Sequence, residues 1–258
     1  MPYVNGIYYF ANNAKMHDLP PILLIHGAGG SNLSWPAEIR RLPDQRVLAL
    51  DLPGHGKSSG LGKCSIADYM RIVLDVMDAL NLYKVIVIGH SMGGGIALNL
   101  ALDLPERVLG LGLIATNARL RVSQAILDGL SHPRTSSRTI QTIVDWSFGG
   151  QVDETQKKLA AHLLEKTRPS VLRDDFVACN DFDVSERLPE INKPTLIICG
   201  TEDRMTPLRS SESMAGKIPG SALQTIDLAG HMVMLEQPRR VASILNVFIK
   251  SIQYLPGV

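Results

Sequence analysis

The sequence predicts an α/β protein with a mostly parallel central sheet, flanking helices and an inserted all-helical cap. Short apolar runs rich in Val, Ile and Leu alternate with longer stretches whose apolar residues recur at helical spacing. Apolar runs ended by Gly, Asp or a polar turn are typical of strands buried on both faces of a parallel sheet. The alternation stops at about residue 117 and resumes at about residue 190, which indicates the insertion.

Six segments are predicted to be strands of the sheet, and a hairpin precedes them. Asn5-Gly6 separates Tyr3-Val4 from Ile7–Phe10. Asn-Gly favours the two positive φ angles of a type I′ turn, so we expect a short antiparallel hairpin at one sheet edge. The predicted strands are Ile22–Ile25, Val47–Leu50, Val85–Ile88, Val108–Ile114, Thr195–Cys199 and Ala222–Ile226.

Amphipathic spacing predicts the helices between and after these strands. Apolar residues recur every three or four positions from Ile66 to Leu80, and Ser65 and Asp68 have the spacing of a capping box. The same spacing predicts a final helix near the C-terminus. Within the insertion, the segment from Asp153 to Thr167 is helix-like. We therefore divide the chain into a core in two parts, residues 1–116 and 190–258, and a helical cap, residues 117–189.

Composition and charge limit the classes of partner. The 258 residues carry a formal net charge of +1, which gives no reason to expect a nucleic-acid or membrane partner. The cysteines Cys64, Cys179 and Cys199 are odd in number and far apart, which argues against a disulfide framework. Met1 to Lys15 lacks the pattern of a secretory signal. We expect a cytoplasmic monomer or homodimer that acts on a small molecule.

The strongest chemical motif is Gly89-His90-Ser91-Met92-Gly93, a G-x-S-x-G that joins a predicted strand to an apolar helix from about Gly94 to Leu104. A sharp turn at Ser91 strains the backbone and crowds the positions two residues away, which favours glycine there. The turn also places Ser91 at a helix N-terminus, whose partial positive charge favours a developing anion. We therefore predict that Ser91 is a nucleophile.

A serine nucleophile needs a base, and the base needs an acid to orient it. His231 is our candidate base because it follows the last predicted strand, and ligands of open α/β sheets bind at the carboxyl ends of strands. Asp203 is our candidate acid because it follows the strand before that one. Glu202 and Asp227 are its competitors. No H-x-H or H-E-x-x-H pattern and no G-x-G-x-x-G after the first strand is present, so we expect neither a metal nor a cofactor.

Four segments carry a resemblance to a known family, and each follows a predicted strand. They are His26–Gly30, Asp51–Ser58, Gly89–Gly93 and the paired loops Gly200–Asp203 and Ala229–His231. Over its whole length the chain resembles the α/β-hydrolase superfamily, in which the triad has the order Ser, Asp, His. The resemblance implies a triad of Ser91, Asp203 and His231. It also implies an oxyanion hole from the N–H groups of Ala28 and Met92, and a lid at the position of the insertion.

The resemblance implies a carboxylesterase for small or medium acyl chains. Relatives with Asp at the nucleophile position are dehalogenases and epoxide hydrolases, so Ser91 indicates an acyl-enzyme. An enol-lactone hydrolase is a close alternative. A hydrolase of carbon–carbon bonds in ring-cleavage products is another alternative. That group usually shows Gly-Pro-Gly near the oxyanion loop, and Ala28-Gly29-Gly30-Ser31 of this chain departs from that pattern, which disfavours this alternative. A binding protein without catalysis is a further alternative.

The cap should form a wall of the substrate pocket. We expect Trp146 and Phe148 to contribute apolar substrate contacts from this segment. Four cap arginines could meet a substrate carboxylate, although a solvated helix face is the interpretation that we favour for them. They are Arg119, Arg121, Arg134 and Arg138.

Overall fold

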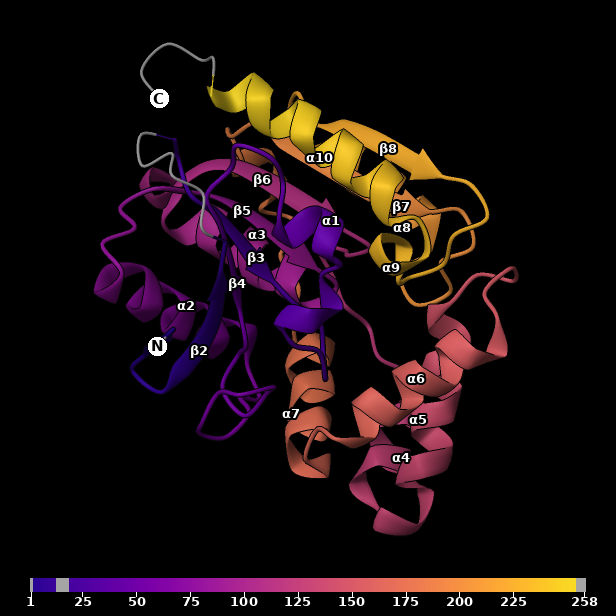
Figure 1. The fold of residues 1–258 in the computed structure, drawn as a ribbon. Helices are drawn as coiled ribbons and strands as arrows, with labels where there is room; N and C mark the ends of the chain where they lie inside the picture. The colour runs from indigo at the N-terminus through magenta and orange to yellow at the C-terminus, as the bar shows by residue number, and fades with distance from the viewer. Residues whose placement is uncertain (1, 13–18, 254–258) are drawn as a thin grey trace.

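The computed structural model describes residues 2–12 and 19–253. Within them, eight strands form one sheet in the order β1-β2-β4-β3-β5-β6-β7-β8, with helices on both faces (Figure 1). β1 pairs with β2 and β2 pairs with β4 in antiparallel fashion, whereas the remaining neighbours are parallel. The predicted fold class is confirmed.

The strands match the apolar runs of the sequence closely. Asn5 and Gly6 have φ angles of 50° and 78°, and they connect the two strands of the predicted N-terminal hairpin at the sheet edge. The strands are β1 (Tyr3–Val4), β2 (Ile7–Ala11), β3 (Ile22–Ile25), β4 (Val47–Leu50), β5 (Val85–His90), β6 (Val108–Ile114), β7 (Thr195–Gly200) and β8 (Ala222–Ile226).

The helices predicted after Ser65, after the turn that follows β5, within the insertion and near the C-terminus are present, with one shift at the turn after β5. There the helix begins at Met92, two residues before the predicted start, because the turn is confined to Ser91. The α-helices are α1 (Ala37–Arg40), α2 (Ile66–Ala79), α3 (Met92–Asp103), α4 (Gln124–Ser131), α5 (Pro133–Ser147), α6 (Glu154–Glu165), α7 (Pro169–Asn180), α8 (Leu208–Lys217), α9 (Val233–Glu236) and α10 (Pro238–Gln253). Among the described segments, none forms a helix with both the length and the apolar character needed to span a bilayer.

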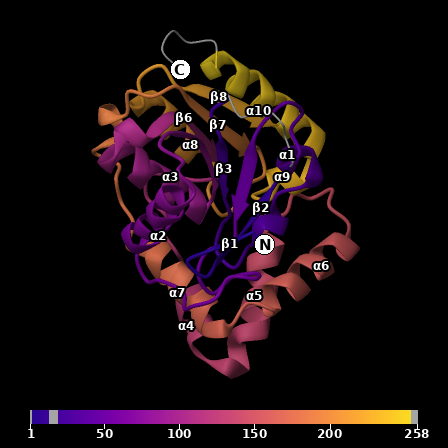
Figure 2. The same cartoon turned by 60° about the vertical axis from the view of Figure 1, so that its left-hand side comes forward.

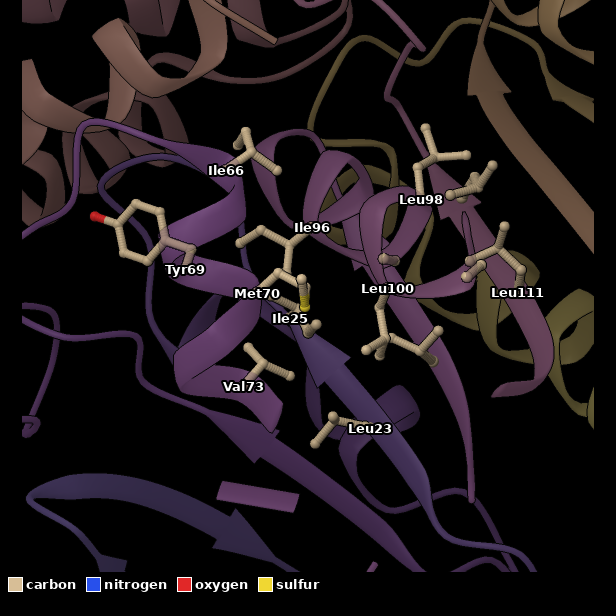
Figure 3. Packing of buried hydrophobic residues seen from close by; sticks show 14 of the residues in the cluster. Leu23, Ile25, Ile66, Tyr69, Met70, Val73, Ile96, Leu98, Leu100 and Leu111 are labelled. Atoms are coloured by element: carbon tan, nitrogen blue, oxygen red, sulfur yellow. The ribbon is translucent and has the colours of Figure 1, made fainter. Parts of the chain in front are cut away.

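Alternate residues of the central strands supply two cores, one on each face of the sheet. Leu23 and Ile25 of β3 pack against α2 and α3, whereas Ile22 and Leu24 pack toward α1 and α10. Successive strand side chains point to opposite faces, which produces this division. Figure 2 shows the sheet between these helix pairs. Figure 3 shows Leu23 and Ile25 in the first core beside Met70, Val73 and Ile96.

Helices α4 to α7 form the cap between β6 and β7, and they gather at one end of the sheet (Figure 1). The chain enters and leaves the cap side by side, through residues 118–120 and 182–184, which we call the neck. There the N–H of Val184 donates to the carbonyl of Ala118 at 2.9 Å. Apolar residues of α4, α5 and α7 give the cap a small core of its own: Ile126, Leu130, Ile140, Ile143, Leu172 and Phe176.

Candidate active site

The turn at Ser91 has the strained backbone that the motif predicts. Ser91 has φ 52° and ψ −117° and is the N-cap of α3. A left-handed conformation at a non-glycine residue costs on the order of 1–3 kcal/mol. A Cβ on Gly89 would overlap the backbone of Gly93, and one on Gly93 would overlap the carbonyl of Ile25. Glycine at both positions therefore lets β5 pass directly into α3 beside the end of β3.

The loop after β3 lies against this turn. A Cβ built on Gly27 would lie 3.1 Å from the Cβ of Ser91 and 2.9 Å from Nδ1 of His90. The next residue, Ala28, and the first helical residue, Met92, carry the predicted oxyanion donors. Within the part of the chain that the structure describes, neither backbone N–H has a hydrogen-bond acceptor. Ala28 lines the same cavity as Ser91, whereas Met92 is buried directly behind Ser91 at the start of α3.

The structure brings Asp203 and His231 together. Both are buried, and Nδ1 of His231 lies 3.0 Å and 3.2 Å from the two carboxylate oxygens of Asp203. Burial raises the pKa of Asp203, but the charge and hydrogen bond of His231 and hydrogen bonds from Thr206 outweigh it and hold this pKa below its ordinary value. The carboxylate is therefore ionised and can hold the imidazole in one orientation.

Two glycines allow the loops after β7 and β8 to meet. A Cβ on Gly200 would overlap the carbonyl of Ala229, and one on Gly230 would lie 2.6 Å from the backbone of Phe148. The N–H of Glu202 donates to the carbonyl of Ala229 at 2.8 Å, which fixes one loop against the other. The glycines that precede Asp203 and His231 in the sequence thus explain how these two residues come within hydrogen-bond distance.

The competing acids make other contacts. The carboxylate of Glu202 accepts from the N–H of Gly150 at 2.7 Å. Asp227 is bonded through its carbonyl, which accepts from the side-chain amide of Gln237 at 2.7 Å. Within residues 2–12 and 19–253, only Asp203 places a carboxylate on the ring of His231.

Ser91 and His231 face one cavity of about 1030 Å³. The ring of His90 lies 4.9 Å from that of His231, and its Nε2 donates to the carbonyl of His231 at 3.0 Å. Burial lowers the pKa of His90 to about 3, so this ring is a neutral support. In the described part of the chain, no hydrogen bond joins Oγ of Ser91 to His231. A looser approach of this kind is common in ligand-free sites.

Apolar cap residues form much of the cavity wall. Phe148 lines it, whereas Trp146 is not among its lining residues and packs partly buried against the cap core. Arg119 and Arg121 line the cavity, and Arg134 and Arg138 do not. Apolar side chains from α5, α6 and α7 complete the wall: Ile143, Val144, Leu163, Leu164 and Phe176.

Asp175 of α7 is a site residue that sequence reasoning missed. It is fully buried, and its carboxylate accepts from the N–H of Gly29 at 2.8 Å and from the hydroxyl of Tyr69 at 2.5 Å. Nε2 of His55 lies 2.7 Å from the same carboxylate. The hydroxyl of Thr167 donates to the carbonyl of Gly29 at 3.0 Å. The cap therefore binds both backbone polar groups of Gly29, the residue that follows Ala28 in this loop.

Glu236 was also missed, and it braces the loop of His231. Its carboxylate accepts from the N–H groups of Gly230 and Gly149, each at 3.0 Å. Burial raises the pKa of Glu236 despite these hydrogen bonds. Among the described residues, no group of three or more His, Cys, Asp or Glu side chains is placed to hold a metal ion.

Comparison with known proteins identifies a family. The model of a family described as "Alpha/beta hydrolase family" matches residues 22–244. The chain is 29% identical to 3-oxoadipate enol-lactonase 1 of Acinetobacter baylyi over 91% of this chain and 90% of that protein. It is also 29% identical to 2-hydroxymuconate semialdehyde hydrolase of Pseudomonas putida over 89% of this chain and 86% of that one.

Among solved structures, a thermophilic esterase superposes with a TM-score of 0.82 at 29% identity, covering 95% of this chain and 98% of the esterase. The family model covers most of the chain. The chain belongs to the alpha/beta hydrolase family.

Proposed function

We propose that this protein is a serine hydrolase that cleaves carboxylic esters of small to medium acyl chains. The observation that carries the proposal is the buried Asp203–His231 pair, which opens on the same cavity as the strained turn at Ser91. A hydroxyl at a helix N-terminus beside an oriented imidazole is the arrangement that nucleophilic acyl transfer requires.

In the proposed mechanism, Oγ of Ser91 attacks the ester carbonyl carbon while its proton passes to Nε2 of His231. Asp203, bonded to Nδ1, stabilises the resulting imidazolium. The oxyanion accepts hydrogen bonds from the N–H groups of Ala28 and Met92, and losing one such donor typically costs ~3 kcal/mol in the barrier. His231 then protonates the leaving alcohol. Water, activated by the same ring, attacks the acyl-enzyme and releases the acid.

The cap supplies the proposed acyl pocket. We keep Phe148 as a substrate contact because it lines the cavity, and we assign Trp146 to the packing behind it. The neck supports the division into a cap of residues 117–189 between core parts of residues 1–116 and 190–258, because the two cap ends pair at Arg119 and Asp183.

Enol-lactone hydrolysis is the second candidate. A lactone is an internal ester, so the same groups would open it by the same steps. The specific observation in its favour is the similarity to 3-oxoadipate enol-lactonase 1 over nearly the whole of both chains. A panel of 4-nitrophenyl esters of increasing chain length, assayed beside enol-lactones, ranks the two candidates by kcat/KM.

The test of the mechanism is Ser91→Ala. Removing the nucleophile of such a relay should lower kcat by about 10³-fold or more. A fluorophosphonate should label the native protein and leave the variant unlabelled, because only an activated serine reacts. Ser251→Ala, an exposed serine of α10, is the matched control and should retain full activity. Undiminished ester hydrolysis by a folded Ser91→Ala preparation would overturn the proposal, and an unlabelled native protein would favour a binding role.

A further inference from the structure

The cavity that holds Ser91 and His231 is lined by charges of one sign. Its lining contains six cationic side chains and, among the described residues, no Asp or Glu. The whole chain carries 26 Lys and Arg against 25 Asp and Glu, so this imbalance belongs to the cavity and not to the protein. The six cations are Lys57, Arg119, Arg121, Lys166, Arg168 and Arg209.

These cations reach the cavity from separate parts of the fold. Lys57 lies in the loop after β4, and Arg121 lies in the segment between β6 and α4. Lys166 and Arg168 lie between α6 and α7, and Arg209 lies in α8. All six are exposed residues of the lining, and apolar cap side chains form the wall. The ammonium of Lys57 lies over the ring of Tyr8, and the guanidinium of Arg168 donates to the carbonyl of Gly60. Both the core and the cap therefore contribute to one positive opening.

Few of these charges are neutralised by the protein. Arg119 pairs with Asp183 at 3.2 Å, but both side chains are about half exposed, and such surface pairs are weak. The structure shows no ion pair for Arg121, Lys166 or Arg209 within the residues that it describes. Of the buried carboxylates behind the lining, Asp175 faces His55, Asp203 faces His231, and Asp51 accepts from the backbone N–H groups of Asn32 and Lys57. The six cations of the lining outnumber these three carboxylates. A net positive field therefore remains at the opening.

A cleft with walls of low dielectric and one sign of charge concentrates the field and raises the local concentration of oppositely charged ligands. Arginine and lysine bind carboxylates through charge-assisted hydrogen bonds. A neutral ester would gain nothing from this arrangement. A substrate with an apolar middle and an anionic end could place its carbonyl at Ser91 and its charge at the opening.

Building on the proposed serine hydrolase, we propose that the substrate is an ester or lactone that carries a carboxylate remote from the bond that is cleaved. The cationic opening attracts and retains that carboxylate, while Phe148 and the apolar cap wall receive the carbon chain. The expected signature is a preference for the anionic member of a matched substrate pair that appears in KM and weakens as salt is added.

The test compares mono-4-nitrophenyl adipate, which carries a carboxylate, with its neutral methyl ester, after subtraction of spontaneous hydrolysis. We expect kcat/KM to be about 10-fold higher for the anionic ester at low salt. The preference should vanish between about 0.01 M and about 1 M salt, where the Debye length falls from ~30 Å to ~3 Å. A lower or equal kcat/KM for the anionic ester at low salt would overturn the proposal and leave the hydrolase assignment intact.

Variants separate the cavity charges from net charge. Arg121→Gln/Arg209→Gln removes two cations of the lining, and Arg134→Gln/Arg138→Gln removes two cations of α5 that lie outside it. The first pair should lose most of the preference through a higher KM for the anionic ester, and the second should keep it. Equal behaviour of the two pairs would overturn the assignment to the opening.

A binding measurement covers the case in which no ester is hydrolysed. Calorimetric titration of Ser91→Ala with adipate and with neutral dimethyl adipate requires no turnover. Salt-sensitive binding of adipate alone would support the anionic ligand even if the hydrolase mechanism failed. Absence of adipate binding, or equal binding of both compounds, would overturn the inference.

Discussion

Burial and the hydrogen-bond partners of their ring nitrogens set the pKa values of two histidines near the site, His26 and His55. Nδ1 of His26 donates to the carbonyl of Gly27 and Nε2 accepts from the N–H of Leu52, which the neutral ring satisfies, and burial lowers its pKa to about 3. Both nitrogens of His55 face acceptors, the carbonyl of Pro53 and the carboxylate of Asp175. Burial lowers the pKa of His55, but the Asp175 charge and hydrogen bond outweigh it and raise this pKa overall. The surroundings of His55 therefore favour its charged form, and those of His26 favour the neutral ring.

Asp203→Asn tests the orientation of His231. The amide can present an N–H to Nδ1 in place of a carboxylate oxygen, which favours the wrong tautomer, so kcat should fall by about 10⁴-fold. Circular dichroism and the melting temperature should show a folded protein. Activity within about tenfold of the native value would contradict the role of Asp203. Glu202→Gln, a neighbouring acid without a contact to the ring, is the control and should change kcat by less than about threefold.

At the scale of elements, close backbone approaches decide where glycine is required. Gly93 lies where α3 meets the end of β3, and Gly29 has φ 65° between the side chains of Leu164 and Leu172. A Cβ added to Gly216 of α8 would meet no neighbouring atom within 4 Å. Glycine is therefore required at position 93 for the close contact of α3 with β3, whereas at position 216 it only lowers the stability of α8.

Gly93→Ala and Gly216→Ala should change stability in opposite directions. The first forces α3 away from the carbonyl of Ile25 and should lower the free energy of unfolding by about 1–3 kcal/mol. The second removes backbone freedom from the unfolded chain and should raise it by about 0.5–1 kcal/mol. Urea unfolding of both variants measures the two changes. A stable Gly93→Ala protein would mean that the contact between α3 and β3 relaxes easily.

The attachment of α7 to the core is tested by Asp175→Asn. Breaking a buried ion pair from one side should cost about 3 kcal/mol. Because the pKa of His55 is raised, the stabilisation by its charge is fully present below the ordinary value of 6.5 and is lost as pH rises through the raised pKa. The melting temperature deficit of the variant should therefore be larger at about pH 6 than at about pH 9.

Asp174→Asn is the control for this pair, since its carboxylate is partly exposed and its ion pair with Arg173 is long, at 3.5 Å. We expect its free energy of unfolding to change by less than about 0.5 kcal/mol. An equal deficit for Asp175→Asn at both pH values would show that His55 is uncharged in the folded protein.

For the whole molecule, the sequence predicted the sheet and most of the candidate site, because both depend on local patterns. Strands buried on both faces are contiguous apolar runs, and the loops that carry Ser91, Asp203 and His231 each follow a predicted strand and contain a glycine. The position of Asp175 was not predictable, because Arg173-Asp174-Asp175 resembles a solvated charge run. The packing of α6 was not predictable either. Leu159 and Leu163 occupy its apolar positions but are 58% and 47% exposed.

The cap and the core should unfold together, because α7 belongs to both. The two tryptophans report on the two parts: Trp35 is fully buried in the core and Trp146 packs against the cap core. In Trp35→Phe, urea unfolding followed by the fluorescence of Trp146 should coincide with that followed by far-ultraviolet circular dichroism. Trp146→Phe provides the reciprocal measurement. An earlier fluorescence transition in Trp35→Phe would show that the cap melts alone.

The cap could be exchanged as one segment between related proteins, since the polypeptide crosses between core and cap at two adjoining places in the neck. Such an exchange is nevertheless constrained by the contacts that the cap makes with the core. A transplanted cap without an acid at the position of Asp175 would leave buried donors of Gly29, His55 and Tyr69 without an acceptor. Each unpaired donor would cost about 1–3 kcal/mol. Chimeras that carry this one carboxylate should fold where otherwise identical ones fail.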